Sequence, residues 1–215
     1  MQINIEKSAC MRIGIRYKNT DHSILIKNIA LSWKQEIKYL GICILSGNIF
    51  SCNLQGARQK FFRAVNGIFG KIGVKSSPTV SCSLIKSYCL PILLFSLESV
   101  NLKKKNIVKL ESAYSQSFSK MFNTYNESII NRCQYFLGIF PLRYLVNINK
   151  FNFLRTIELR SDLFSYLFKN EIRCELIEIC NTFEIDHLTV LNNNVNVRTV
   201  LWNHFELSAE RLLPD

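Results

Sequence analysis

Residues 53–73 read "NLQGARQKFFRAVNGIFGKIG", and this stretch decides the fold. Its large apolar residues recur at intervals of three and four, which is the spacing of one face of an α-helix. Gly73 and the Ser-Ser-Pro sequence a few residues later are typical of a helix end. The stretch therefore predicts one amphipathic helix. Its apolar face consists of Phe61, Val65, Ile68 and Ile72, widened by Phe62 and Phe69.

One flank of this predicted helix is positively charged, and no Asp or Glu occurs between Glu36 and Glu98. Lys60, Arg63, Gly67 and Lys71 lie within roughly 60° of one another at 100° per residue. Such a flank suits a phosphate backbone, because Gly lets the main chain come close and each cation releases a counterion. The alternative is a solvated face, although surface helices ordinarily mix signs. The predicted nucleic-acid-binding residues are Arg58, Lys60, Arg63, Gly67, Lys71 and Lys75.

The composition favours a folded protein with a polyanionic partner. Of the 215 residues 48% are hydrophobic, which is enough for a core, and the formal net charge is +11. The longest apolar run, residues 89–95, is too short to span a bilayer, so we expect no membrane partner. No secretory signal is visible at the N-terminus, so we expect an intracellular protein, cytoplasmic or nuclear and not secreted.

The chain is expected to be mainly α-helical with a small antiparallel β portion at its N-terminus, an α+β class. Residues 1–52 are predicted to be strands, beginning with one strand around Ile3 and Ile5 and a second around Ile13. Residues 53–125 are predicted to form a three-helix bundle. Its second helix is apolar nearly all round and is expected to kink at Pro91, and its third runs from Ile107. Residues 126–215 are predicted to be a C-terminal helical extension.

Residues for metal binding or catalysis are sparse. The strongest zinc candidate among the eight cysteines is Cys174 and Cys180 with His187, which lacks a fourth ligand, so a structural role for the cysteines is the preferred interpretation. No two aspartates are adjacent or alternate, as a two-metal phosphoryl-transfer site requires. The aspartates are Asp21, Asp162, Asp186 and Asp215.

Five blocks, in order, resemble the region downstream of the catalytic Asp pair in reverse transcriptases of non-LTR (LINE-type) retrotransposons. The blocks are "INIEKSACMRIGIR", "LSWKQEIKYLGI", "ARQKFFRAVNGIFGKIG", "LIKSYCLPILLFSLE" and "FSKMFNT". The likeness runs from residue 3 to about residue 160. It implies palm-edge strands and a primer-grip-like hairpin in residues 1–52 and a thumb-like bundle in residues 53–125.

The resemblance also implies roles for single residues. Lys7 matches the Lys of a Lys-Ser pair in the palm, near the phosphates of the incoming nucleotide. Tyr39, Leu40 and Gly41 match the primer-grip hairpin. The first thumb helix of the family touches the template-primer duplex, and the basic flank described above lies on the matching helix.

The family's catalytic Tyr-x-Asp-Asp hairpin lies upstream of the block that begins here at Lys7. We therefore expect a truncated, catalytically incomplete fragment of an RNA-directed DNA polymerase, which does not polymerise DNA by itself and keeps some RNA/DNA duplex binding through the thumb. No cofactor is expected in this chain, whereas the complete polymerase uses Mg²⁺. One alternative is a host-recruited helical protein-interaction module without nucleic-acid function. Another is a reading-frame fragment that does not fold stably.

Overall fold

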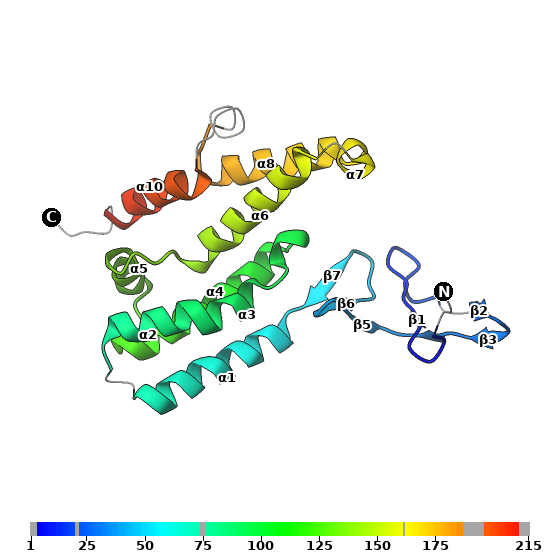
Figure 1. Cartoon of the computed structure of the whole chain (residues 1–215), viewed down its shortest axis with the longest axis horizontal. Coiled ribbons are helices and arrows are strands. Elements are labelled where there is room, and N and C mark those ends of the chain that lie inside the picture. The colour runs from blue at the N-terminus through cyan, green and yellow to red at the C-terminus, as the bar shows by residue number, and fades with distance from the viewer. Residues whose placement is uncertain (1–3, 20–21, 74–75, 161, 187–195, 211–215) are drawn as a thin grey trace. The chain divides into compact units, whose positions relative to one another are not determined.

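The chain consists of a small β unit followed by a larger helical unit (Figure 1). The structure, a computed structural model, describes residues 4–19, 22–73, 76–160, 162–186 and 196–210. Its two compact units are Met1–Ala57 and Arg58–Asp215. The predicted class, mainly α with a small N-terminal β portion, is confirmed.

Short strands build the first unit. Strands β5 (Glu36–Tyr39), β6 (Ile42–Leu45) and β7 (Ser51–Asn53) form a three-stranded antiparallel sheet, and β2 (Leu25–Ile26) pairs with β3 (Ile29–Ala30). The third pair, β1 (Ala9–Cys10) with β4 (Ser32–Trp33), is parallel, so the expectation of an antiparallel portion holds for two of the three sheets.

The predicted opening strand is wrong in its described part, because residues 4–8 form a turn. The backbone N–H of Ser8 donates to the carbonyl of Ile5 at 3.1 Å, and the side chain of Asn4 accepts from the N–H of Lys7 at 3.2 Å. An Asn side chain that bonds nearby main chain competes with strand pairing, and this competition outweighs the alternation of Ile3 and Ile5. The second predicted strand is also shorter than expected, since Ile13 makes only an isolated bridge to Gly47.

A two-residue loop joins β5 to β6. Tyr39 pairs with Ile42, which leaves Leu40 and Gly41 as the loop, with φ angles of 46° and 87°. Two positive φ angles in succession are the requirement of a tight hairpin turn whose twist matches the strands. Gly meets it freely, whereas an exposed Leu in this region is strained.

Helix α1 (Gln55–Ile72) matches the helix predicted from residues 53–73. The side chain of Asn53 accepts from the N–H of Gln55 at 3.0 Å at its start. At its end Gly73 takes a φ of 78° and its N–H bonds the carbonyl of Phe69 at 3.0 Å, as the sequence predicts.

The second helical stretch is broken into four pieces. They are α2 (Pro78–Leu84), a π turn (Ile85–Cys89), α3 (Leu90–Leu94) and a 3₁₀ turn (Leu97–Ser99). The predicted disturbance at Pro91 takes the form of the π turn, in which the N–H of Leu90 reaches back five residues to the carbonyl of Ile85. Because Pro91 has no N–H and its ring crowds the preceding turn, a widened turn before it relieves the clash.

This stretch is also the one helical segment in the described part of the chain that is long and apolar enough to cross a membrane. Pro78–Ser99 reaches a mean hydropathy of 1.7. Core helices of soluble proteins can have the same length and composition. Here 39% of the most apolar window is buried, including Ile85, Cys89 and Leu93.

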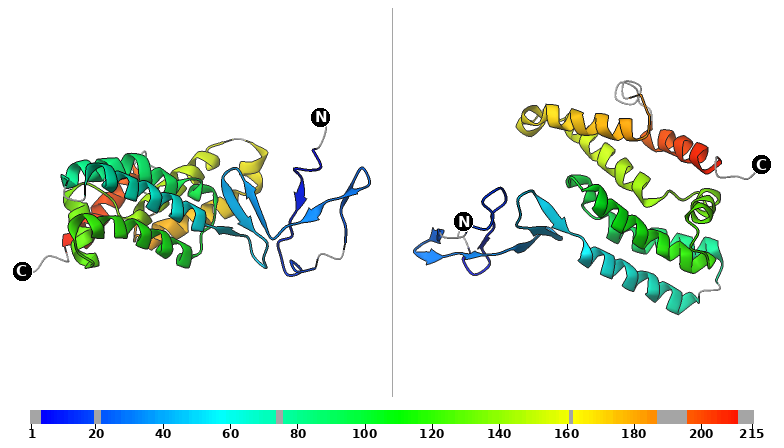
Figure 2. Two further views of the ribbon diagram at one scale, coloured as in Figure 1. Left: turned by 90° about the horizontal axis from the view of Figure 1, so that it is seen from below. Right: turned by 180° about the vertical axis from the view of Figure 1, so that it is seen from behind.

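Helix α4 (Lys104–Phe122) completes the predicted bundle and begins three residues before the predicted start at Ile107. Lys104 and Lys105 belong to this helix, and Lys103 precedes it. The Phe61 ring of α1 lies 6.4 Å from the Tyr114 ring of α4, and the Cys82 thiol of α2 lies 3.5 Å from the Met121 sulfur of α4. Helices α1, α2 and α4 accordingly lie side by side (Figure 2).

The remaining helices form a second core within the helical unit. They are α5 (Glu127–Phe136), α6 (Leu142–Glu158), α7 (Leu163–Leu167), α8 (Lys169–Thr182) and α10 (Val197–Glu210). Phe151 of α6, Leu176 of α8 and Leu201 of α10 are fully buried in one apolar cluster. The predicted helical extension of residues 126–215 is thus helical wherever the structure describes it, apart from its connecting turns.

The packing of this core can be tested by making the same substitution at a buried and at an exposed leucine of α10. Leu201 is 0% exposed and Leu207 is 57% exposed. We expect Leu201→Ala to lower the free energy of unfolding by about 2–5 kcal/mol, because it leaves a cavity. We expect Leu207→Ala to lower it by less than about 1 kcal/mol. Urea unfolding followed by circular dichroism measures both, and equal losses would show that α10 does not pack as described.

Candidate nucleic-acid interface

The exposed face of α1 is the candidate interface. Phe61, Val65 and Phe69 are buried, and this fixes the rotation of the helix about its axis. The predicted residues on the opposite side all face solvent. They are Lys60, Arg63, Gly67 and Lys71, which we call the α1 basic face.

Among the described residues, no carboxylate forms an ion pair with this face. In the part of the chain that the structure describes, the ion pairs are Arg143–Glu111, Lys150–Glu175 and Arg173–Glu158, all outside α1. Exposed like charges on one helix repel one another by a few tenths of a kcal/mol per pair. The repulsion is relieved when a polyanion binds, and the condensed counterions that the polyanion releases add a favourable entropy.

Gly67 and Gly70 make this side of α1 unusually bare. A Cβ atom added at either glycine would meet nothing within 4 Å, so no packing requires a glycine at these positions. Glycine in a helix interior costs roughly 0.5–1 kcal/mol relative to alanine. Because glycine has no side chain, the two glycines on the charged side of α1 let a ligand approach the main chain closely.

The structure adds a cation that the sequence analysis missed, Lys120 of α4. Its Nζ donates to the Oδ1 of Asn66 at 3.2 Å and lies 5.2 Å from the centre of the Phe69 ring. Asn66 is exposed on α1 between the buried face and Gly70, so Lys120 borders the α1 basic face. No sequence signal on α4 shows which of its flanks meets α1, because that depends on the Phe61–Tyr114 contact.

Arg58 is among the predicted nucleic-acid-binding residues, but it does not belong to the α1 basic face. It lies about 160° from Lys60 around the helix, on the side of Phe61 and Val65. The residue is half-buried, and its Nε is buried without a hydrogen-bond partner among the described residues. Lys75, the last predicted member of the group, lies outside the described residues.

The remaining predicted residues belong to the first unit. Lys7 is exposed in the turn that Asn4 stabilises. Tyr39 and Leu40 are 62% and 75% exposed at the tip of the β5–β6 hairpin, beside the exposed Gly41. A β-hairpin lies at these residues, with two large side chains in solvent at its strained turn, and its role as a primer grip stays a prediction.

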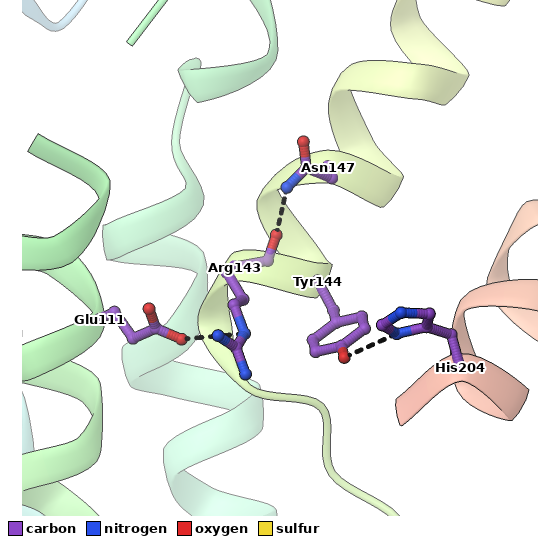
Figure 3. A network of polar contacts seen from close by, with 5 residues as sticks. All are labelled: Glu111, Arg143, Tyr144, Asn147 and His204. Atoms are coloured by element: carbon purple, nitrogen blue, oxygen red, sulfur yellow. Dashed lines mark hydrogen bonds and ion pairs between the residues drawn. The ribbon is translucent and has the colours of Figure 1, made fainter. Parts of the chain in front are cut away.

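A second group of polar residues, also missed from sequence, joins three helices of the helical unit (Figure 3). Arg143 of α6 lies 3.7 Å from the carboxylate of Glu111 on α4, and burial raises the pKa of Glu111 against the lowering effect of Arg143. The Tyr144 hydroxyl and Nδ1 of His204 on α10 are hydrogen-bonded at 3.0 Å. Tyr144 is 1% exposed, and a phenol so buried serves as a core contact rather than as a group that meets substrate.

Four of the eight cysteines are buried, namely Cys52, Cys82, Cys89 and Cys180. Cys174 is exposed, whereas Cys180, six residues along α8, is buried, so the two candidate zinc ligands differ in environment. His187 lies outside the described residues. Within the described ranges no three His, Cys, Asp or Glu residues cluster as metal ligands.

Comparison with known proteins identifies no relative of this chain. No family model matches it, and neither a curated protein nor a solved structure matches it.

Thiol reactivity tests the burial of the cysteines. Burial raises the pKa of Cys82 and of Cys89 to about 11, so both remain protonated at pH 8. Because the thiolate is the reactive form, we expect rapid modification of Cys174 by an aromatic disulfide reagent and protection of Cys82 and Cys89. Mass spectrometry of tryptic peptides locates the labels, and labelling in denaturant provides the control in which all eight cysteines react. Labelling of Cys89 as fast as Cys174 would contradict the structure.

Proposed function

We propose that the α1 basic face binds the phosphate backbone of a nucleic-acid duplex, with an RNA/DNA hybrid as its first candidate ligand. The observation that carries the proposal is the set of exposed cations Lys60, Arg63 and Lys71 on a helix without an acid, beside an unpacked glycine. With the sequence resemblance, this supports a role as the primer-grip and thumb portion of a LINE-type reverse transcriptase. The proposal concerns binding, not polymerisation.

The dimensions of the face suit a duplex. Lys60 and Lys71 are eleven residues apart, about 16 Å along a helix axis at 1.5 Å per residue. Successive base pairs rise about 3.4 Å, so the face spans about five of them. Flexible Lys and Arg side chains can follow phosphates over this length, and the bare main chain at Gly67 permits contact without an intervening side chain.

The β5–β6 hairpin is a second feature that agrees with the proposed primer-grip role. Tyr39 and Leu40 are large, exposed side chains, and Leu40 is held at a φ of 46°. Backbone strain of this kind persists where function requires a particular loop. In this proposal the hairpin tip contacts the primer, as the resemblance of Tyr39, Leu40 and Gly41 implies.

A second candidate function, a helical protein-interaction module, is favoured by one other observation. A groove of about 640 Å³ lies between the α3 segment and α6, with Leu90, Pro91, Leu94, Phe95 and Phe153 among its lining residues. Phe95 is 59% exposed there. Protein partners that co-purify after complete nuclease digestion would favour this function over duplex binding.

Removal of three cations tests duplex binding. We expect Lys60→Ala/Arg63→Ala/Lys71→Ala to weaken binding to a labelled RNA/DNA hybrid. We also expect it to make the slope of log K against log salt less steep by about 2.7, since each phosphate contact contributes about 0.9. Fluorescence anisotropy across a salt series measures both quantities.

The matched control is Lys103→Ala/Lys104→Ala/Lys105→Ala. It removes the same charge from three exposed lysines at the start of α4, away from the α1 basic face. We expect this variant to keep most of the wild-type salt slope. If the two triple variants lose affinity equally, binding depends on net charge alone and the α1 basic face is not the interface.

Gly67→Ala separates folding from binding, because the two effects have opposite signs. The added methyl group enters open space, so we expect the free energy of unfolding to rise by roughly 0.5–1 kcal/mol. In the complex the methyl group stands between the main chain and the phosphates, so affinity for the hybrid should fall. Urea unfolding and anisotropy measure the two effects. A variant that is stabilised and binds as tightly as the wild type would show that the main chain of α1 does not contact the duplex.

A further inference from the structure

The segment that joins α6 to α8 exposes an unusual amount of apolar surface. Its large side chains are between 44% and 79% exposed, although all of them lie within ten residues of sequence. We call them the α7 patch. They are Leu159, Leu163, Phe164, Tyr166, Leu167 and Phe168.

The polarity of α7 is inverted relative to an ordinary surface helix. Ser165 is its one buried residue, at 7% exposure. The Ser165 hydroxyl shares its single hydrogen between the carbonyl oxygens of Arg160 and Asp162, which lie 2.6 and 2.8 Å from Oγ. The Asp162 side chain accepts from the N–H of Ser165 at 2.8 Å, and this hydrogen bond lowers the pKa of the Asp162 carboxyl. The hydrogen bonds of Ser165 and Asp162 thus stabilise the start of α7 on its buried side, while the apolar side chains of α7 are exposed to solvent.

The side chains of the α7 patch surround more than half of the circumference of the helix, and together they expose an apolar area comparable with one side of a stable protein interface. With about 200 Å² for a large apolar side chain, the observed exposures amount to on the order of 800 Å². The largest apolar patch on a typical monomer is about 300–600 Å². A standard interface buries about 800 Å² on each partner.

The charges at the two ends of the patch indicate what covers it. Arg160 and Asp162 precede α7, Lys169 and Glu171 follow it, and all four are exposed. The ends are balanced in charge, so they do not favour an anionic membrane or a nucleic acid. If two copies of α7 pack antiparallel, Asp162 of each faces Lys169 of the other and Arg160 faces Glu171. This arrangement is self-complementary, as a two-fold interface requires.

We propose that two copies of this chain form a two-fold dimer through antiparallel packing of the α7 patch. The interface is apolar at its centre and charged at its rim. It is separate from the α1 basic face, and its existence does not depend on nucleic-acid binding.

The test is the mass of the full chain in solution, measured by sedimentation at several concentrations after nuclease treatment and in high salt. We expect the wild type to dimerise and Tyr166→Glu to be monomeric. The matched control is Tyr125→Glu, which makes the same change at a tyrosine that is 92% exposed outside the patch, and it should still dimerise. A wild type that is monomeric at every concentration, or a Tyr166→Glu variant that dimerises like the wild type, would overturn the proposal.

Charge reversal tests the antiparallel arrangement without altering the apolar centre. Arg160→Glu alone and Glu171→Arg alone each place like charges opposite one another and should weaken the dimer several-fold. The double variant Arg160→Glu/Glu171→Arg should restore it, whereas no rescue would contradict the antiparallel arrangement. Co-sedimentation of a monomeric wild type with phosphatidylcholine–phosphatidylserine vesicles would assign the patch to a lipid surface instead.

Discussion

The packing of α1 against α4 is the contact on which the candidate interface depends. Phe61 meets Tyr114 at 6.4 Å, and Tyr114 meets Phe118 edge-on at 5.0 Å, with all three rings almost fully buried. Burial of three large rings is worth several kcal/mol, more than the repulsion among three exposed cations. This contact sets the rotation of α1 and so turns Lys60, Arg63 and Lys71 toward solvent. It also brings Lys120 to the border of the same face.

The sequence predicted the elements whose pattern is local. The spacing of Phe61, Val65 and Phe69 identified α1 and its exposed flank, because a regular helix determines which residues share a face. The end of α1 at Gly73 followed from the conformational freedom of glycine. The prediction of an opening strand is wrong for an equally local reason. The side chain of Asn4 accepts a hydrogen bond from the backbone N–H of Lys7, and this turn replaces the strand that the alternation of apolar residues predicts.

What the sequence could not supply depends on contacts between distant residues. Lys120 joins the interface only because α4 lies beside α1. Arg58 is a different case, because its position about 160° from Lys60 follows from helix geometry alone. The pairing of Tyr144 with His204 links positions sixty residues apart that have no shared motif. The inverted polarity of α7 also cannot be read from the sequence, because it depends on which side chains the rest of the fold covers. The sequence "LFSYLF" resembles an ordinary core segment until its burial is known.

The α1 basic face and the α7 patch have one feature in common: each is unfavourable in free energy when it is exposed to water. On α1 the cost is glycine in a helix interior and unpaired like charge. On α7 the cost is exposed apolar area, whose side chains the hydrogen bonds of Ser165 and Asp162 keep turned toward solvent.

These two unfavourable features are relieved by different ligands. Unpaired charge on a bare helix is relieved by a polyanion, and its binding weakens as salt rises. Apolar area with balanced charges at its ends is relieved by a similar surface, and that association persists in salt. Ionic strength therefore separates the two surfaces within one chain.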